Sequence, residues 1–271
     1  MSVDEHTIEL GGSPVYYRSA AVPQVPPLYL HGVPTSSDDW TDFLERTGGI
    51  APDLIGFGRS GKAGNLDYSI AGLANFVEDF LDNLGITRVQ LVAHDWGAAA
   101  GLALAQRHPD RIERIVLINP LPLLPHFAWH RLARLWRATM LGELAMGSTT
   151  RWVLGRALRR GVETPNAWPK ERVRTVYEQF DQGTQRAILR LYRGTSEQQL
   201  ADAGGDLKTL SMPALIIRGL CDPWIPGIFG EKYARVLPNA TLETLPDAGH
   251  WPWLDDTRVI DRVAAFLEEP G

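Results

Sequence analysis

The sequence contains 271 residues, of which 44% are hydrophobic and 22% are charged, and its formal net charge is −5. This length fits one α/β domain with or without an insertion, and the acidic balance argues against a nucleic-acid-binding protein. No apolar run reaches the ~20 residues of a membrane span, and no Cys/His cluster has metal-ligand spacing, so we expect neither a membrane nor a metal partner.

The N-terminus lacks the basic and apolar regions of a secretory signal. The only cysteine, Cys221, excludes an internal disulfide and suits a reducing compartment. We therefore expect a cytoplasmic protein.

Short β-rich runs alternate with helical patterns in the first 120 residues, which predicts an α/β fold with a largely parallel sheet. Residues 6–10 and 15–18 predict an opening hairpin around a Gly-Gly-Ser-Pro turn. Further strands are predicted at residues 27–30, from Ile50, and at 88–93 and 112–118, and a helix is predicted over residues 69–84.

The five residues AHDWG at 93–97 follow a predicted strand and open a stretch of small residues. Small residues around a central nucleophile are typical of the sharp strand-to-helix turn called the nucleophile elbow. Here the central residue is Asp95, whose carboxylate can attack a saturated carbon and form an ester with it. The alternative is that Asp95 only caps the next helix.

The loop after the strand at 27–30 reads HGVP at residues 31–34. In elbow enzymes this loop and the residue after the nucleophile each supply a backbone N–H to an oxyanion hole. These positions are Val33 and Trp96, although an ordinary strand-end turn would also explain the loop.

Residues 121–208 show no obvious strand and are predicted to form helices broken by Gly and Pro. This segment carries 14 Lys and Arg against 8 Asp and Glu, a net charge of +6, so the remainder of the chain carries −11. We interpret it as a helical cap inserted in a core domain made of residues 1–120 and 209–271. Its many arginines are interpreted as a solvated helix face, with an anionic substrate or a membrane surface as the alternative.

Strands are predicted again at residues 214–219 and 240–245, before a closing helix at 257–267. Asp222 follows the first of these strands, and His250 follows the second. The order nucleophile, acid, histidine is that of elbow enzymes, and the carboxyl ends of parallel strands meet at one edge of a sheet. We predict that His250 is the base and Asp222 its acid partner, with Asp247 as the alternative acid.

The motifs HGVPT (31–35), APDLIGFGRS (51–60), HDWG (94–97) and DAGH (247–250) together resemble the α/β-hydrolase superfamily, in its epoxide hydrolase and haloalkane dehalogenase branch. The resemblance covers the core domain and implies an aspartate nucleophile and no cofactor. Tyr192 resembles the cap tyrosine with which epoxide hydrolases protonate the ring oxygen, and a similar tyrosine occurs in fluoroacetate dehalogenases. The earlier cap tyrosine of epoxide hydrolases is missing, and Tyr177 is a candidate for its place.

Dehalogenases of one group hold the halide with an Asn at the position of Val33 and place their acid at the position of Asn119. This chain has Val33 in place of the halide-binding Asn and Asn119 in place of the acid, so both features of that dehalogenase group are missing. Another group uses a cap tryptophan together with the tryptophan after the nucleophile. This resemblance leaves a substrate-binding role open for the following tryptophans: Trp96, Trp129, Trp136, Trp152 and Trp168.

We therefore predict an epoxide hydrolase that acts on a small apolar substrate with water, without cofactor, nucleic acid or membrane, as a monomer or homodimer. A haloalkane dehalogenase with the same Asp/His/Asp set is the alternative. A ligand-binding homologue without catalysis is the second alternative.

Overall fold

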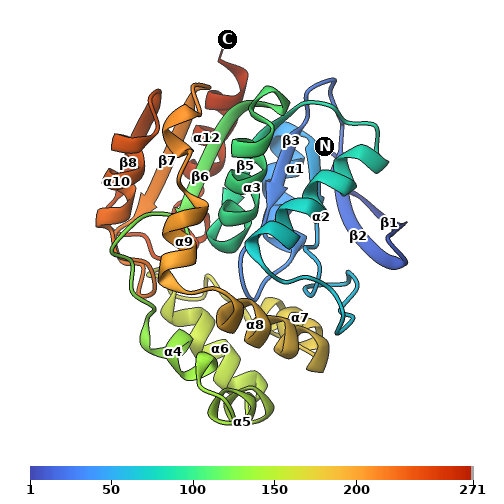
Figure 1. Ribbon diagram of the computed structural model, residues 1–271, viewed down its shortest axis with the longest axis vertical. Helices are drawn as coiled ribbons and strands as arrows, with labels where there is room; N and C mark the ends of the chain where they lie inside the picture. Colours follow the sequence, from blue (N-terminus) through green and yellow to red (C-terminus); the bar gives the residue numbers. More distant parts are fainter. Residues whose placement is uncertain (270–271) are drawn as a thin grey trace.

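One sheet runs through the computed structural model, which describes residues 1–269. Its strands span Asp4–Leu10 (β1), Ser13–Ala20 (β2), Pro27–Leu30 (β3), Gly49–Pro52 (β4), Val89–His94 (β5), Ile112–Pro120 (β6), Ala214–Gly219 (β7) and Ala240–Leu245 (β8). Their order in the sheet is β1-β2-β4-β3-β5-β6-β7-β8 (Figure 1). The β1–β2 and β2–β4 pairs are antiparallel, and the pairs from β4–β3 to β7–β8 are parallel. The predicted α/β class with a mostly parallel sheet is confirmed.

The opening hairpin is tighter than the sequence predicted. Only Gly11 and Gly12 form its turn, both in the left-handed region with φ of 57° and 76°. Glycine reaches this region without steric cost, so two residues suffice to reverse the chain. Ser13 and Pro14 consequently belong to β2, and Pro14 lies opposite Glu9 of β1.

Helices cover both faces of the sheet and one of its ends. They span Thr41–Thr47 (α1), Ile70–Asn83 (α2), Asp95–Arg107 (α3), Arg131–Arg137 (α4), Leu141–Gly147 (α5), Arg151–Arg160 (α6), Lys170–Gln179 (α7), Gln182–Gly194 (α8), Glu197–Ala203 (α9), Ile228–Val236 (α10), Pro252–Asp255 (α11) and Arg258–Glu268 (α12). α2 and α3 pack together on one face of the sheet, and α1 and α12 pack together on the other (Figure 1).

The helical region α4–α9 is inserted between β6 and β7. Figure 1 shows α4 to α8 gathered at one end of the sheet. β3, β6 and β7 are buried along almost their whole length, as expected of central parallel strands covered on both faces. The exact division into residues 1–120, 121–208 and 209–271 stays a prediction, and residues 270–271 lie outside the described part of the chain.

Among the described residues, no helix combines the length and apolar character needed to cross a bilayer.

Candidate active site

Asp95 lies at the turn between β5 and α3, with a φ of 48° that is unusual for a residue with a side chain. Two glycines permit this turn. A Cβ atom on Gly97 would lie 2.3 Å from the carbonyl oxygen of Leu30, and one on Gly32 would lie 2.6 Å from the Cβ of Asp95. The chain therefore brings its backbone against the aspartate, as the predicted elbow requires.

The Asp95 carboxylate is buried but is not isolated. The Val33 N–H donates to its Oδ2 at 3.1 Å. Burial raises the pKa of Asp95, although His250 and the backbone N–H groups of Val33 and Trp96 act in the opposite direction. These two N–H groups are placed where they can stabilise negative charge on the carboxyl oxygen of an ester on Asp95.

His250 and Asp222 form a buried pair beside this carboxylate. The Nδ1 atom of His250 lies 2.8 Å from Oδ2 of Asp222, whose Oδ1 accepts the N–H groups of Trp224 and Ile225 at 2.9 and 3.1 Å. Burial alone would raise the pKa of Asp222, but His250, Arg218 and the Trp224 N–H lower it to about 2. Burial opposes protonation of His250, but the Asp222 and Asp95 carboxylates outweigh burial and raise its pKa.

The alternative acid, Asp247, is exposed to solvent before the His250 loop. The structure thus brings Asp95, His250 and Asp222 together, while their catalytic roles remain our proposal.

Two buried side chains that the sequence analysis did not assign to the site hold this pair in place. Asn119, at the end of β6, donates to the carbonyl oxygens of Gly249 and His250 at 2.7 and 3.0 Å and accepts the Gly219 N–H at 2.9 Å. It therefore joins the loops that carry the acid and the base. Arg218, on β7, donates to Asn119 at 2.9 Å and lies 3.3 Å from Asp222 Oδ2. An arginine in an apolar strand is a signal of such a buried ion pair, because an unpaired buried charge is costly.

Arg218 is expected to influence the pKa of His250, the proposed base. Its positive charge lowers the pKa of His250, so Arg218→Met is expected to raise that pKa. Since the base must be neutral, the acidic limb of ester hydrolysis should then move to higher pH, by the order of one pH unit. Arg218→Lys should move the limb back toward its original position. Single-turnover hydrolysis measured across pH tests this, and an unchanged limb in Arg218→Met would assign Arg218 to packing alone.

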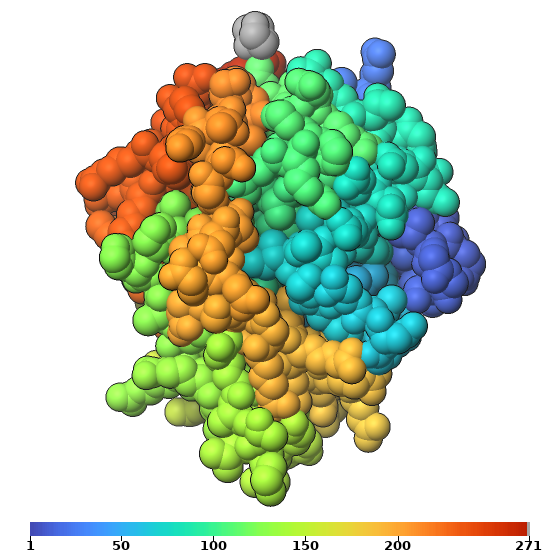
Figure 2. All heavy atoms as spheres, in the orientation of Figure 1, coloured from blue at the N-terminus to red at the C-terminus, as the bar shows by residue number. Residues whose placement is uncertain are grey.

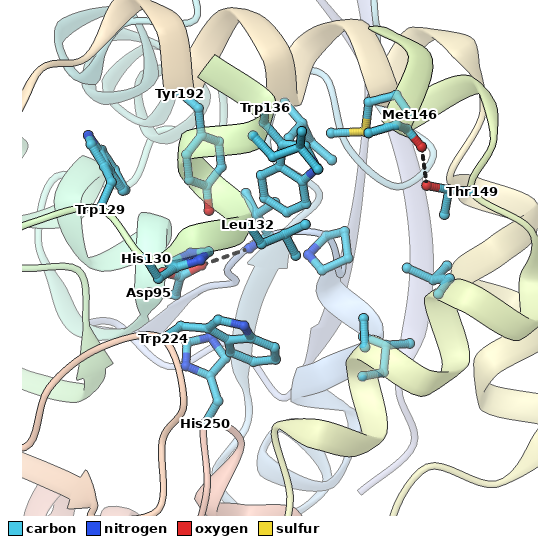
Figure 3. Close-up of a pocket in the computed structure, with 18 of the residues that line it drawn as sticks. Asp95, Trp129, His130, Leu132, Trp136, Met146, Thr149, Tyr192, Trp224 and His250 are labelled. Carbon is cyan, nitrogen blue, oxygen red and sulfur yellow. Dashed lines mark hydrogen bonds between the residues drawn. The ribbon is translucent and has the colours of Figure 1, made fainter. Parts of the chain in front are cut away.

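A cavity of about 280 Å³ opens over Asp95 and His250. Its wall is mostly apolar and comes from α4, α5, α6 and α8 together with the loops after β3, β6, β7 and β8. Figure 3 shows Asp95, His250 and Trp224 at one side of this space and Tyr192 and Trp136 facing them. A small apolar molecule fits such an enclosure better than a charged one.

Tyr192 projects from α8 into the cavity, with its hydroxyl directed toward Asp95 (Figure 3). Its ring is fixed between the rings of Trp96, Trp129 and Trp136, at centroid distances of 5.2, 5.0 and 5.0 Å. Burial and the nearby Asp95 charge raise the pKa of Tyr192 far above its ordinary value. The hydroxyl therefore keeps its proton and can act as a donor.

His130 offers a second N–H donor to the cavity, which the family resemblance does not indicate because it concerns tyrosines and tryptophans of the cap. It lines the cavity near Tyr192, with ring centroids 6.5 Å apart. Its Nδ1 accepts the Ala133 N–H at 3.2 Å and caps α4, which places the ring proton on Nε2. Burial and the neighbouring His250 lower the pKa of His130 to about 4, so it is neutral near pH 7.

Three predicted pocket residues lie elsewhere. Trp152 is 71% exposed on α6, and Tyr177 is 36% exposed on α7. Trp168 is buried against Trp251, with ring centroids 5.0 Å apart, and is not part of the cavity wall among the described residues. The structure therefore does not bring these three residues to the cavity over Asp95, because the family resemblance indicates residue types in the cap and not which cap helix faces the cavity.

Three predicted tryptophans lie at or beside the cavity. Trp129 and Trp136 line it. The Trp129 indole nitrogen is on the side of its ring away from Asp95 (Figure 3). Trp96 is fully buried behind Tyr192 and Trp129.

Among the described residues, no three His, Cys, Asp or Glu side chains are grouped in a way that could hold a metal ion.

Comparison with known proteins shows which proteins this chain is similar to. The family profile described as alpha/beta hydrolase fold matches residues 27–257. A haloalkane dehalogenase of Mycolicibacterium paratuberculosis is 33% identical, over 86% of this chain and 83% of its own length. Three other relatives that match over shorter stretches are also named haloalkane dehalogenases.

Solved structures agree on the fold. The crystal structure of the haloalkane dehalogenase DbeA from Bradyrhizobium elkani superposes with a TM-score of 0.85 at 25% identity, covering 98% of both chains. The epoxide hydrolase CorEH superposes with a TM-score of 0.83 at 20% identity, covering 98% of this chain and 99% of its own. The similarity to CorEH is evidence of the fold alone.

Proposed function

The chain belongs to the α/β-hydrolase fold family, in the branch of haloalkane dehalogenases and epoxide hydrolases, and we propose that it hydrolyses epoxides through an ester on Asp95. One observation carries the choice of epoxides: two neutral proton donors, Tyr192 and His130, line the cavity that holds the Asp95 carboxylate. An epoxide oxygen becomes an alkoxide as its ring opens, and it needs such a donor.

In the first step, a carboxylate oxygen of Asp95 attacks an epoxide carbon and the carbon–oxygen bond of the ring breaks. Tyr192 gives its proton to the leaving oxygen, and the Nε2–H of His130 donates a hydrogen bond to the same oxygen. The product is a hydroxyalkyl ester of Asp95. The apolar wall keeps bulk water from competing for these donors.

In the second step, His250 takes a proton from a water that attacks the carboxyl carbon of the ester. Asp222 stabilises the resulting imidazolium, and the N–H groups of Val33 and Trp96 hold the oxyanion. Collapse of this intermediate breaks the ester bond, and the departing alkoxide takes the proton from His250. The remaining proton of the added water returns to Tyr192, so that one epoxide and one water give one vicinal diol.

Haloalkane dehalogenation is the second candidate, and the names of the relatives favour it over epoxide hydrolysis. A specific feature also supports it: the Trp96 indole N–H is buried next to the nucleophile, and its one neighbour that can accept a hydrogen bond among the described residues is the Tyr192 hydroxyl, with a geometry outside the ordinary range. Against it, Val33 has no side-chain donor, and the Trp129 nitrogen faces away from Asp95. The ester hydrolysis would be the same in both reactions.

Parallel turnover assays distinguish the two reactions. Purified protein should convert styrene oxide and aliphatic epoxides to diols faster than it releases halide from bromohexane and chlorohexane. Halide release without any diol formation would replace the epoxide assignment by the dehalogenase one. Absence of both activities, and of ester hydrolysis, would favour a ligand-binding homologue.

A further inference from the structure

Exposed apolar side chains are concentrated on three consecutive helices of the inserted region. Of the eleven large hydrophobic residues that the structure exposes, six lie on or between α4, α5 and α6. These six are Leu135, Met140, Leu141, Leu144, Trp152 and Val153. Figures 1 and 2 show that the three helices form one end of the molecule along its long axis. We call the surface of residues 131–160 the α4–α6 face. A grouping of this kind marks an interaction site more often than scattered apolar residues do.

The same surface is strongly basic. Residues 131–160 contain seven arginines and one acidic residue, Glu143, whereas the rest of the chain carries a net charge of −11. Glu143 is neutralised by Arg193, at 2.6 Å. None of the seven arginines pairs with a carboxylate of residues 1–269, although most arginines elsewhere do. Arg137 is half-buried and donates to the carbonyl oxygens of Tyr192 and Thr195, but the other six arginines are exposed, so their positive charge is available to an anionic partner.

The cavity over Asp95 reaches this face. Leu135 and Val153 line the cavity and are also 37% and 43% exposed, so they belong both to its wall and to the outer surface. A route between the α4–α6 face and the nucleophile would thus pass along apolar side chains.

We infer that the α4–α6 face docks onto the surface of an anionic phospholipid bilayer. Arginines around leucine and tryptophan side chains suit this partner, because the guanidinium groups attract lipid phosphates while the apolar groups enter the interface. Trp152, 71% exposed and 6.0 Å from the Arg156 guanidinium, is placed as an interfacial anchor. The cavity mouth would then face the layer in which an apolar substrate dissolves.

A second copy of the chain is a less suitable occupant. Its acidic remainder would also attract the arginines, but a protein surface seated on the α4–α6 face would close the cavity, whereas a bilayer holds dissolved apolar molecules that can enter it. The docking does not depend on the proposed reaction. Only the delivery of a substrate to Asp95 rests on the proposed function.

Cosedimentation with vesicles tests the docking without any substrate. The full chain should sediment with vesicles of equal parts phosphatidylglycerol and phosphatidylcholine, less strongly at high salt, and not with phosphatidylcholine alone. Reversing two charges in the variant Arg151→Glu/Arg156→Glu should lower the partition coefficient at least about tenfold. Leu144→Ser/Trp152→Ser should lower it by a similar factor.

Matched controls change the same residue types elsewhere on the surface. Arg88→Glu/Arg235→Glu alters the net charge equally, and Leu220→Ser/Ile228→Ser removes two exposed apolar side chains, so both should bind vesicles like the parent. Unchanged thermal melting checks that the variants are folded. Failure of the parent to bind anionic vesicles, or equal losses in test and control variants, would overturn the inference. So would a dimer, seen by sedimentation velocity, that the α4–α6 variants abolish while vesicle binding persists.

Discussion

A His250→Gln variant treated with styrene oxide is expected to accumulate an ester on Asp95. Alkylation needs only the Asp95 carboxylate and the donors on the opposite wall, whereas hydrolysis needs a base beside the ester. Glutamine keeps much of the volume of histidine but cannot accept the proton of water, so hydrolysis should slow by roughly 10²–10⁴-fold. Intact-mass spectrometry should show one adduct per chain, and peptide mapping should place it on the peptide that contains Asp95.

His108→Gln is the matched control, because His108 lies at the surface end of α3 beside Glu78, far from the cavity wall. It should turn over substrate like the parent and show no adduct. Asp95→Ala combined with His250→Gln should show none either. An adduct on another peptide would remove Asp95 from its proposed role as nucleophile. Full turnover by His250→Gln would remove His250 from its proposed role as base.

Tyr192→Phe is expected to slow alkylation by epoxides by roughly 10²–10⁴-fold. The ring and its packing against Trp96, Trp129 and Trp136 are retained, so the loss reports on the hydroxyl proton rather than on the fold. Trp96→Phe should have a smaller effect, because the backbone N–H that faces Asp95 remains. Single-turnover kinetics measure both.

Two further variants sharpen this test. Tyr177→Phe changes an exposed tyrosine of α7 in the same way and should have no effect. His130→Asn keeps a side chain that can cap α4 but removes the Nε2–H donor, and it should slow epoxide opening while ester hydrolysis proceeds. If Trp96→Phe is the more damaging variant and Tyr192→Phe is not, the dehalogenase reaction is favoured.

The three central residues of the candidate site could be predicted because each of them follows the end of a strand. β5, β7 and β8 end just before Asp95, Asp222 and His250, and parallel strands bring their carboxyl ends to one edge whatever the side chains are. The predicted class, the inserted helical region and the family resemblance are confirmed, since they rest on this backbone pattern and on the motifs of the core.

The cavity wall could not be predicted in the same way. Trp136 and Trp152 are both tryptophans of the inserted helices, yet one lines the cavity and the other faces solvent, because helix packing decides which face turns inward. His130 was not predicted, because the family resemblance concerns tyrosines and tryptophans of the cap. Arg218 was not predicted either, because it stands in an apolar strand and its influence on His250 depends on a contact with Asp222 that the sequence does not show.

Oxygen-18 labelling tests the covalent role of Asp95 most directly. Excess enzyme should be reacted once with styrene oxide in water enriched in oxygen-18. If Asp95 attacks carbon and water then attacks the Asp95 carboxyl carbon, the first diol receives an unlabelled oxygen from Asp95, and the Asp95 peptide gains the heavy isotope. Heavy oxygen in the first diol, with an unlabelled Asp95 peptide, would mean that water attacks the epoxide directly and would contradict the ester mechanism.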